Sequence, residues 1–216
     1  MPLSHRLLVA FALLGALSPS ALRAVQASKP KVRAVTGFIS IDPKSYPTQI
    51  EEAVKFLSQV RAAVQAAGYE VSGVRITTQP FPQYTRGLSH ADALALLRGI
   101  NDLAGKLNFA PNIGPAMIDD TVDLESVNLL SEILSIPSNR LAANIVTAGD
   151  DGIHWNAVHQ AARIIHAVGE RSLHGQGNFN FAAIAMLKPY GPFYPGAWHS
   201  GTGPRVLLLD CNPQMS

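Results

Sequence analysis

Apolar residues of this chain gather in short runs, and longer segments with helical spacing separate those runs. Five of the runs are short and rich in β-branched or apolar residues, as buried strands are. They cover 32–41, 71–78, 111–118, 141–148 and 179–187. Because these runs are apolar rather than alternating, the pattern favours strands that are covered on both faces, as in parallel sheets.

Helices are predicted between the strands. The first begins at Pro47 and ends at Gly68, where a glycine stop is common. Ser89 and Asp92 form a capping pair for the second helix, and Asp120 is the expected N-cap of the third. Strand starts recur about every 30 to 40 residues, as in βαβ units. The sequence therefore predicts an α/β fold of repeated strand–helix units with a parallel sheet.

The first 27 residues have the pattern of a secretory signal peptide. His5 and Arg6 precede an apolar run over 7–17, and Val25-Gln26-Ala27 resembles a cleavage site. The alternative is an uncleaved anchor, which so short an apolar run disfavours. We therefore expect an exported protein, periplasmic or extracellular, with no membrane partner once the signal is cut.

Charge and cysteine content exclude several classes of partner. The net charge is +2, from 17 basic and 15 acidic residues. Removing 1–27 takes away Arg6 and Arg23 and no acid, so 15 basic and 15 acidic residues remain. Such a balance gives no support for a nucleic-acid surface. Cys211 is the only cysteine, so neither an intrachain disulfide nor a cysteine-based zinc site can form.

Candidate chemistry lies where strands end, because ligands of parallel α/β folds bind beyond the carboxyl ends of the strands. Asp150, Asp151 and His154 follow the fourth strand, and Asn112 lies near the start of the third. Two carboxylates and an imidazole could move protons or contact a metal. The alternative is that Asp151 only caps the following helix.

Four more polar side chains surround the fifth strand, within 173–203. His174, Asn178 and Asn180 precede it, and His199 follows in a run of aromatic, proline and glycine residues. Polar groups beside a buried strand are costly unless they form hydrogen bonds. These four residues either face a ligand or anchor two glycine-rich loops, and the sequence leaves both interpretations open.

Together these residues form the predicted site. Its catalytic candidates are Asp150, Asp151, His154 and His174, and its ligand-binding candidates are Asn112, Asn178, Asn180 and His199. The chain has no H-E-x-x-H motif and no phosphate-binding P-loop, so the sequence identifies neither a metal nor a cofactor.

Three blocks of the chain, 109–120, 148–165 and 170–203, resemble the uncharacterised family called domain of unknown function 711. The similarity runs from about Val32 to Gly203. The family resembles ribonucleotide reductase and pyruvate formate-lyase in fold. That relationship implies a ten-stranded α/β barrel built from two five-stranded parallel halves. No activity is established for the family, so the resemblance assigns no catalytic residue.

The resemblance also implies a domain organisation. Residues 28–203 would be the N-terminal half of a barrel, and 204–216 a divergent tail, so we expect a truncated chain. A half-barrel exposes strand edges that a second copy or a complementing chain would cover. The expected function is that of an enzyme or a binder of a small polar molecule. The alternatives are a non-catalytic binding module and a non-functional fragment.

Overall fold

The computed structural model describes residues 29, 31–191, 193–201 and 203–212, and for 205–212 it describes the backbone only. The predicted signal segment 1–27 lies outside these residues, so export stays a prediction. The strands are β1 (Lys31–Ile39), β2 (Val71–Thr78), β3 (Ala110–Pro115), β4 (Ala142–Gly149), β5 (Gly152–Ile153), β6 (Phe181–Ala185) and β7 (Arg205–Asn212). The helices are α2 (Tyr46–Ala66), α3 (Pro82–Thr85), α4 (His90–Leu107), α5 (Leu124–Ser135) and α6 (Trp155–Arg171), followed by the 3-10 helix η2 (Leu173–Asn180).

All strands belong to one mainly parallel sheet. β1, β2, β3, β4 and β6 run parallel to one another, and β6 pairs with the side of β4 away from β3. β7 pairs antiparallel with β1, and β5 forms a short hairpin with β4. The predicted α/β class is therefore confirmed. That this sheet is half of a ten-stranded barrel stays a prediction.

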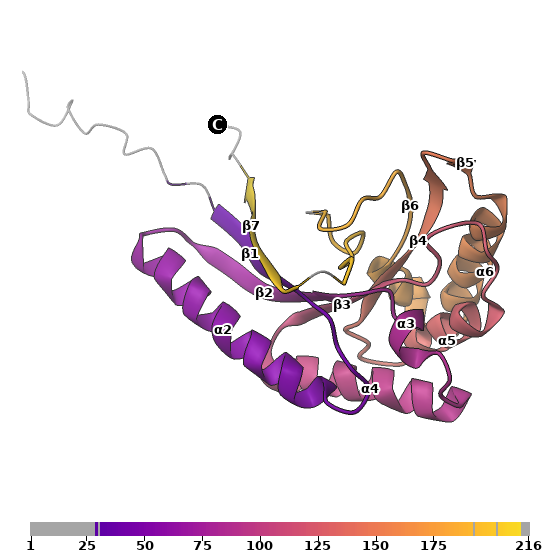
Figure 1. Cartoon of the computed structure of the whole chain (residues 1–216), viewed down its shortest axis with the longest axis horizontal. Coiled ribbons are helices and arrows are strands. Elements are labelled where there is room, and N and C mark those ends of the chain that lie inside the picture. The colour runs from indigo at the N-terminus through magenta and orange to yellow at the C-terminus, as the bar shows by residue number, and fades with distance from the viewer. Residues whose placement is uncertain (1–28, 30, 192, 202, 213–216) are drawn as a thin grey trace, which may run out of the picture.

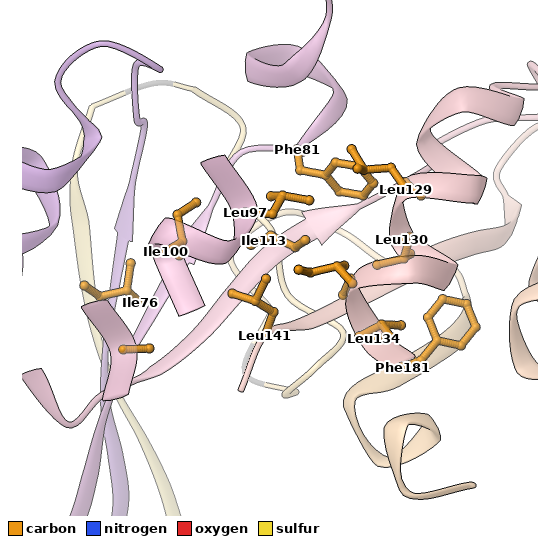
Figure 2. Close-up of a cluster of buried hydrophobic side chains, with 14 of the residues drawn as sticks. Ile76, Phe81, Leu97, Ile100, Ile113, Leu129, Leu130, Leu134, Leu141 and Phe181 are labelled. Atoms are coloured by element: carbon orange, nitrogen blue, oxygen red, sulfur yellow. The ribbon is translucent and has the colours of Figure 1, made fainter. Parts of the chain in front are cut away.

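Helices cover one face of the sheet, and the chain between β6 and β7 lies over the other face (Figure 1). The alternation of strand side chains sets this arrangement, because apolar positions of each strand point toward the helices. Figure 2 shows the resulting core, in which side chains of the strands meet those of α4 and α5. Fully buried members of this core are Ile76, Leu97, Ile100, Ile113, Leu129, Leu130 and Leu134. In the described part of the chain, no helix has the length and apolar character needed to cross a membrane.

Of the two helix N-caps predicted from the sequence, the structure confirms one and replaces the other. Ser89 caps α4 by accepting a hydrogen bond from the backbone N of Asp92. Asp120 was the expected cap of α5, but Asp123 caps that helix. Asp120 instead accepts bonds from the backbone N of Asn156 at 2.7 Å and of Ala157 at 3.2 Å. A carboxylate is favourable there, because the first turn of α6 exposes unpaired N–H groups.

β3 and β6 are at least two residues shorter than predicted, and β1 is one residue shorter. β6 begins only at Phe181, because Leu173–Asn180 forms 3-10 turns with left-handed backbone at His174. β3 ends at Pro115, and its register with β4 shifts between Asn112 and Pro115. Gly114 lies in that irregularity with φ of 74°.

We expect alanine substitutions at two glycines to change stability in opposite directions. At Gly114 a Cβ would meet the backbone oxygen of Gln79 at 2.9 Å in a left-handed conformation. Gly114→Ala should therefore lower the free energy of unfolding by about 2–4 kcal/mol. Gly73 of β2 has open space around its Cβ position, so Gly73→Ala should raise that free energy by about 0.5 kcal/mol. Urea unfolding measures the free energy of both variants. Equal changes in the two variants would contradict the crowding at Gly114 and the open space at Gly73.

Candidate functional site

A row of polar side chains crosses the sheet on the face away from the helices, which we call the inner face. A Cβ at Gly37 would touch Leu57 of α2, so Thr36 of β1 points to the opposite, inner side. Thr77 of β2 lies beside Asn112 of β3, and Asn144 of β4 follows. All four side chains are buried. Polar residues at the centre of a parallel sheet are unusual, because such strands are normally apolar throughout.

The described residues of 187–204, which we call the covering segment, lie on this inner face. The Asn112 amide donates to the backbone oxygens of Pro195 at 2.9 Å and Ala197 at 3.0 Å. Asn144 also donates to the Pro195 oxygen, at 2.9 Å. Two neighbouring strands therefore anchor the covering segment through the same carbonyl group.

Asn112 is fully satisfied by this arrangement, but its neighbours are not. Its Oδ1 accepts a bond from the backbone N of Gly114 at 3.0 Å, and both amide hydrogens are used by the covering segment. Among the described residues, Thr36 Oγ1, Thr77 Oγ1 and Asn144 Oδ1 are buried and have no hydrogen-bond partner. An unsatisfied buried polar atom is costly, and three on one face are uncommon in a native protein.

His199 belongs to the covering segment and is completely buried. Its backbone N donates to Thr78 O at 3.0 Å, and its Nδ1 lies 3.1 Å from the Tyr190 hydroxyl. Tyr190 in turn packs edge-on against Phe38 of β1. The predicted ligand-binding histidine therefore lies at the carboxyl end of β2, where it ties the covering segment to the sheet.

Asp150, Asp151 and His154 follow β4, and of these three only Asp151 and His154 contact each other. His154 Nδ1 is 3.0 Å from Val146 O, and Nε2 is 3.0 Å from Asp151 Oδ1. Both partners can only accept, so both ring nitrogens carry hydrogen in the most favourable state. The bond to Asp151 raises the pKa of His154 above its usual range, and the same bond lowers the pKa of Asp151. Asp150 pairs with Lys188.

The Asp151–His154 pair is not arranged as a general base would be, because a substrate must be able to reach the imidazole of such a pair. The His154 ring is buried while the Asp151 carboxylate is exposed, and neither ring nitrogen is left for a substrate. The contacts join β4 to the start of α6. In the described part of the chain, no three His, Cys, Asp or Glu side chains gather as a metal site would need.

His174, Asn178 and Asn180 lie at the opposite end of the sheet, before β6 begins. Asn178 donates to Ile165 O at 3.1 Å, and Asn180 donates to Asn139 O at 3.4 Å. His174 is exposed. The length of β6, about 15–20 Å, separates them from the residues that follow β4. The structure thus separates the eight predicted residues: Asn112 lies within β3, three lie before β6, and the other four lie toward the carboxyl ends of the strands.

The residues predicted from the sequence do not include Thr36, Thr77 or Asn144. Asn144 interrupts the mainly apolar run 141–148, and that interruption is a signal in the sequence. The runs around Thr36 and Thr77 contain other polar residues, so these two threonines do not stand out.

The His154–Asp151 bond predicts a pH-dependent contribution to stability. Because folding raises the pKa of His154, its contribution is fully present below about pH 6.5 and is lost as pH rises through the folded value. His154→Gln should therefore lower the free energy of unfolding, relative to wild type, by a larger amount at pH 5.5 than at pH 9. His159→Gln, an exposed position on the same helix, is the control and should follow wild type. A deficit that grows with pH would contradict this role.

Comparison with known protein families matches residues 23–209 to the family described as Uncharacterised ACR (DUF711). The matched stretch contains every helix of the fold, strands β1 to β6 and the first part of β7. No curated protein matches the chain at significant similarity. Because the match covers most of the sequence, this protein belongs to the uncharacterised DUF711 family.

Proposed function

We propose that the protein binds a small polar molecule on the inner face of the sheet, beneath the covering segment. The observation that carries the proposal is the row of Thr36 Oγ1, Thr77 Oγ1 and Asn144 Oδ1, buried and unsatisfied by the described residues. Export is part of the proposal and rests on residues 1–27 alone, and the mass of a secreted chain would test it.

The chemistry of these three atoms limits the ligand. Asn144 Oδ1 only accepts hydrogen bonds, while the two threonine hydroxyls both donate and accept. A ligand that satisfies them carries donors as well as acceptors, as hydroxyl and carboxamide groups do. β1 and β4 are three strand spacings apart, about 14 Å, so a single sugar or polyol would satisfy only part of the row, such as the hydroxyls of Thr36 and Thr77 on neighbouring strands.

Access to the row requires the covering segment to move. Its anchors are the bonds from Asn112 and Asn144 to Pro195 and Ala197, which are individually weak enough to open. A loop that closes over a bound molecule excludes water and strengthens its hydrogen bonds. The covering segment would act in this way as a lid.

Catalysis is not part of the proposal. Both nitrogens of His154 bond within the protein, and His174 lies at the far end of the sheet. Beneath the covering segment lie hydroxyl and amide groups and the Arg75 guanidinium, which stacks on the Tyr194 ring, and all of these groups orient a ligand without moving protons at neutral pH. A non-catalytic binding module, one alternative from the sequence, fits these residues better than an enzyme.

The proposal predicts that removing one hydroxyl stabilises the protein. Thr77→Val keeps the side-chain shape but deletes a buried oxygen without a partner, so the free energy of unfolding should rise by about 1 kcal/mol. Thr85→Val is the matched control, because Thr85 Oγ1 donates to Phe81 O at 3.0 Å. It should lower that free energy by about 1 kcal/mol. Destabilisation by Thr77→Val in urea unfolding would mean that the hydroxyl is satisfied internally, for example by water.

Ligand binding itself can be tested with a panel of monosaccharides, polyols and simple carboxamides, each at several millimolar. At least one of these compounds should raise the melting temperature of the full chain, since a ligand of the folded state stabilises it. The shift should disappear in the double variant Thr36→Val, Thr77→Val and persist in Thr85→Val. An equal shift in all three proteins, or none in wild type, would rule out this site.

A further inference from the structure

A second depression lies at the carboxyl end of β1, between α2 on one side and His199, Gly201, Gly203 and Pro204 on the other. It has a volume of about 730 Å³, within the usual range of small-molecule pockets. The hydroxyl and amide row lies on the inner face, whereas this cleft opens toward α2. Both sites share the covering segment, because His199 lines this cleft, but Thr36 and Thr77 do not line it, so the two ligands can be tested separately.

The floor of the cleft is apolar. Ile39, Ala53, Phe56 and Leu57 line it, and the Phe56 side chain is 53% exposed. Gly37 lies beneath, where a Cβ would approach Leu57 at 2.8 Å, so the strand and helix are in close contact. An exposed aromatic ring beside a concave apolar surface provides area that a flat organic group can cover.

One charged side chain stands at this apolar surface. Among the described residues that line the cleft, Glu52 of α2 is the only Lys, Arg, Asp or Glu. It has no ion-pair partner in the described part of the chain. The glutamates near histidines elsewhere, by contrast, are paired, as Glu125 and Glu132 are with His90. The cleft thus combines an apolar floor with one unopposed negative charge.

We propose that the cleft is a binding site for an amphiphilic organic cation. The apolar body of such a ligand covers Ile39, Ala53 and Phe56, and its ammonium group lies against the Glu52 carboxylate. Phe56 contributes a ring face that also attracts cations. Neutral analogues lose the ion pair and anionic analogues are repelled, so charge decides the ligand class.

Three probes with the same indole ring test this assignment: tryptamine, its neutral alcohol tryptophol, and indole-3-propionate. We expect tryptamine to bind the full chain with Kd on the order of 0.1–1 mM. Tryptophol should bind about fivefold more weakly, as loss of an exposed ion pair predicts, and indole-3-propionate should bind weakest. Chemical-shift titration of the full chain measures all three affinities.

Neighbouring glutamates provide a matched control. Glu52→Gln should reduce tryptamine affinity about fivefold and leave tryptophol unchanged, whereas Glu51→Gln, which does not line the cleft, should alter neither. If Glu52→Gln fails to fold, raising the salt concentration on wild type decides the question, because only tryptamine binding should weaken. The assignment is overturned if tryptamine and tryptophol bind alike, or if the two glutamine variants behave alike. It is equally overturned if the cleft is closed by a second copy of the chain, so that tryptamine does not bind.

Discussion

The fold depends on how the polar inner face of a parallel sheet is covered. Helices bury the other face. Parallel strands are normally covered on both faces, because apolar side chains on an uncovered face would stay exposed to water. Here the cover is an irregular segment rather than a layer of helices. Asn112 and Asn144 hold it by donating to backbone oxygens of Pro195 and Ala197, which an irregular segment leaves unpaired.

Several features follow from that anchoring. With Pro195 and Ala197 fixed over β3 and β4, the segment leads back across the sheet to β1. On the way His199 bonds the end of β2 through its backbone N, while Tyr190, earlier in the segment, packs on Phe38 of β1. The chain then enters β7 antiparallel to β1. Two asparagines on neighbouring strands thus fix the point at which the chain crosses β3 and β4, and β7 then pairs with the edge of β1 that β2 leaves open.

The strand and helix order could be predicted because it depends on local patterns. β2 occupies 71–78 as expected, and Ser89 caps α4 because its bond to Asp92 spans only three residues. Asp120 shows the limit of such reasoning: its carboxylate reaches α6, 36 residues away, rather than the helix that follows it. Local spacing contains no information about which distant helix terminus a loop approaches.

The candidate site could be predicted only in part, for the same reason. Asp151 and His154 are three residues apart, and they do form a pair. Asn178 and Asn180 lie at the amino end of β6, whereas the covering segment begins at its carboxyl end. Which end of β6 lies beside the residues that follow β4 is known only once the pairing of the two strands is known. The row of Thr36, Thr77 and Asn144 joins three strands with more than thirty residues between successive members, so no sequence window contains it.

The cost of that row is itself an argument about function. Replacing a buried hydroxyl by a methyl group of the same shape is a single substitution, and where the hydroxyl has no partner it stabilises the fold. Apolar residues would serve the sheet better at Thr36 and Thr77, since helices or loops pack on them equally well. Sequences that violate such a rule at several adjacent positions usually do so at functional sites. On the inner face the two asparagines therefore serve the fold, whereas the unsatisfied hydroxyls of Thr36 and Thr77 are the atoms on which the binding proposal rests.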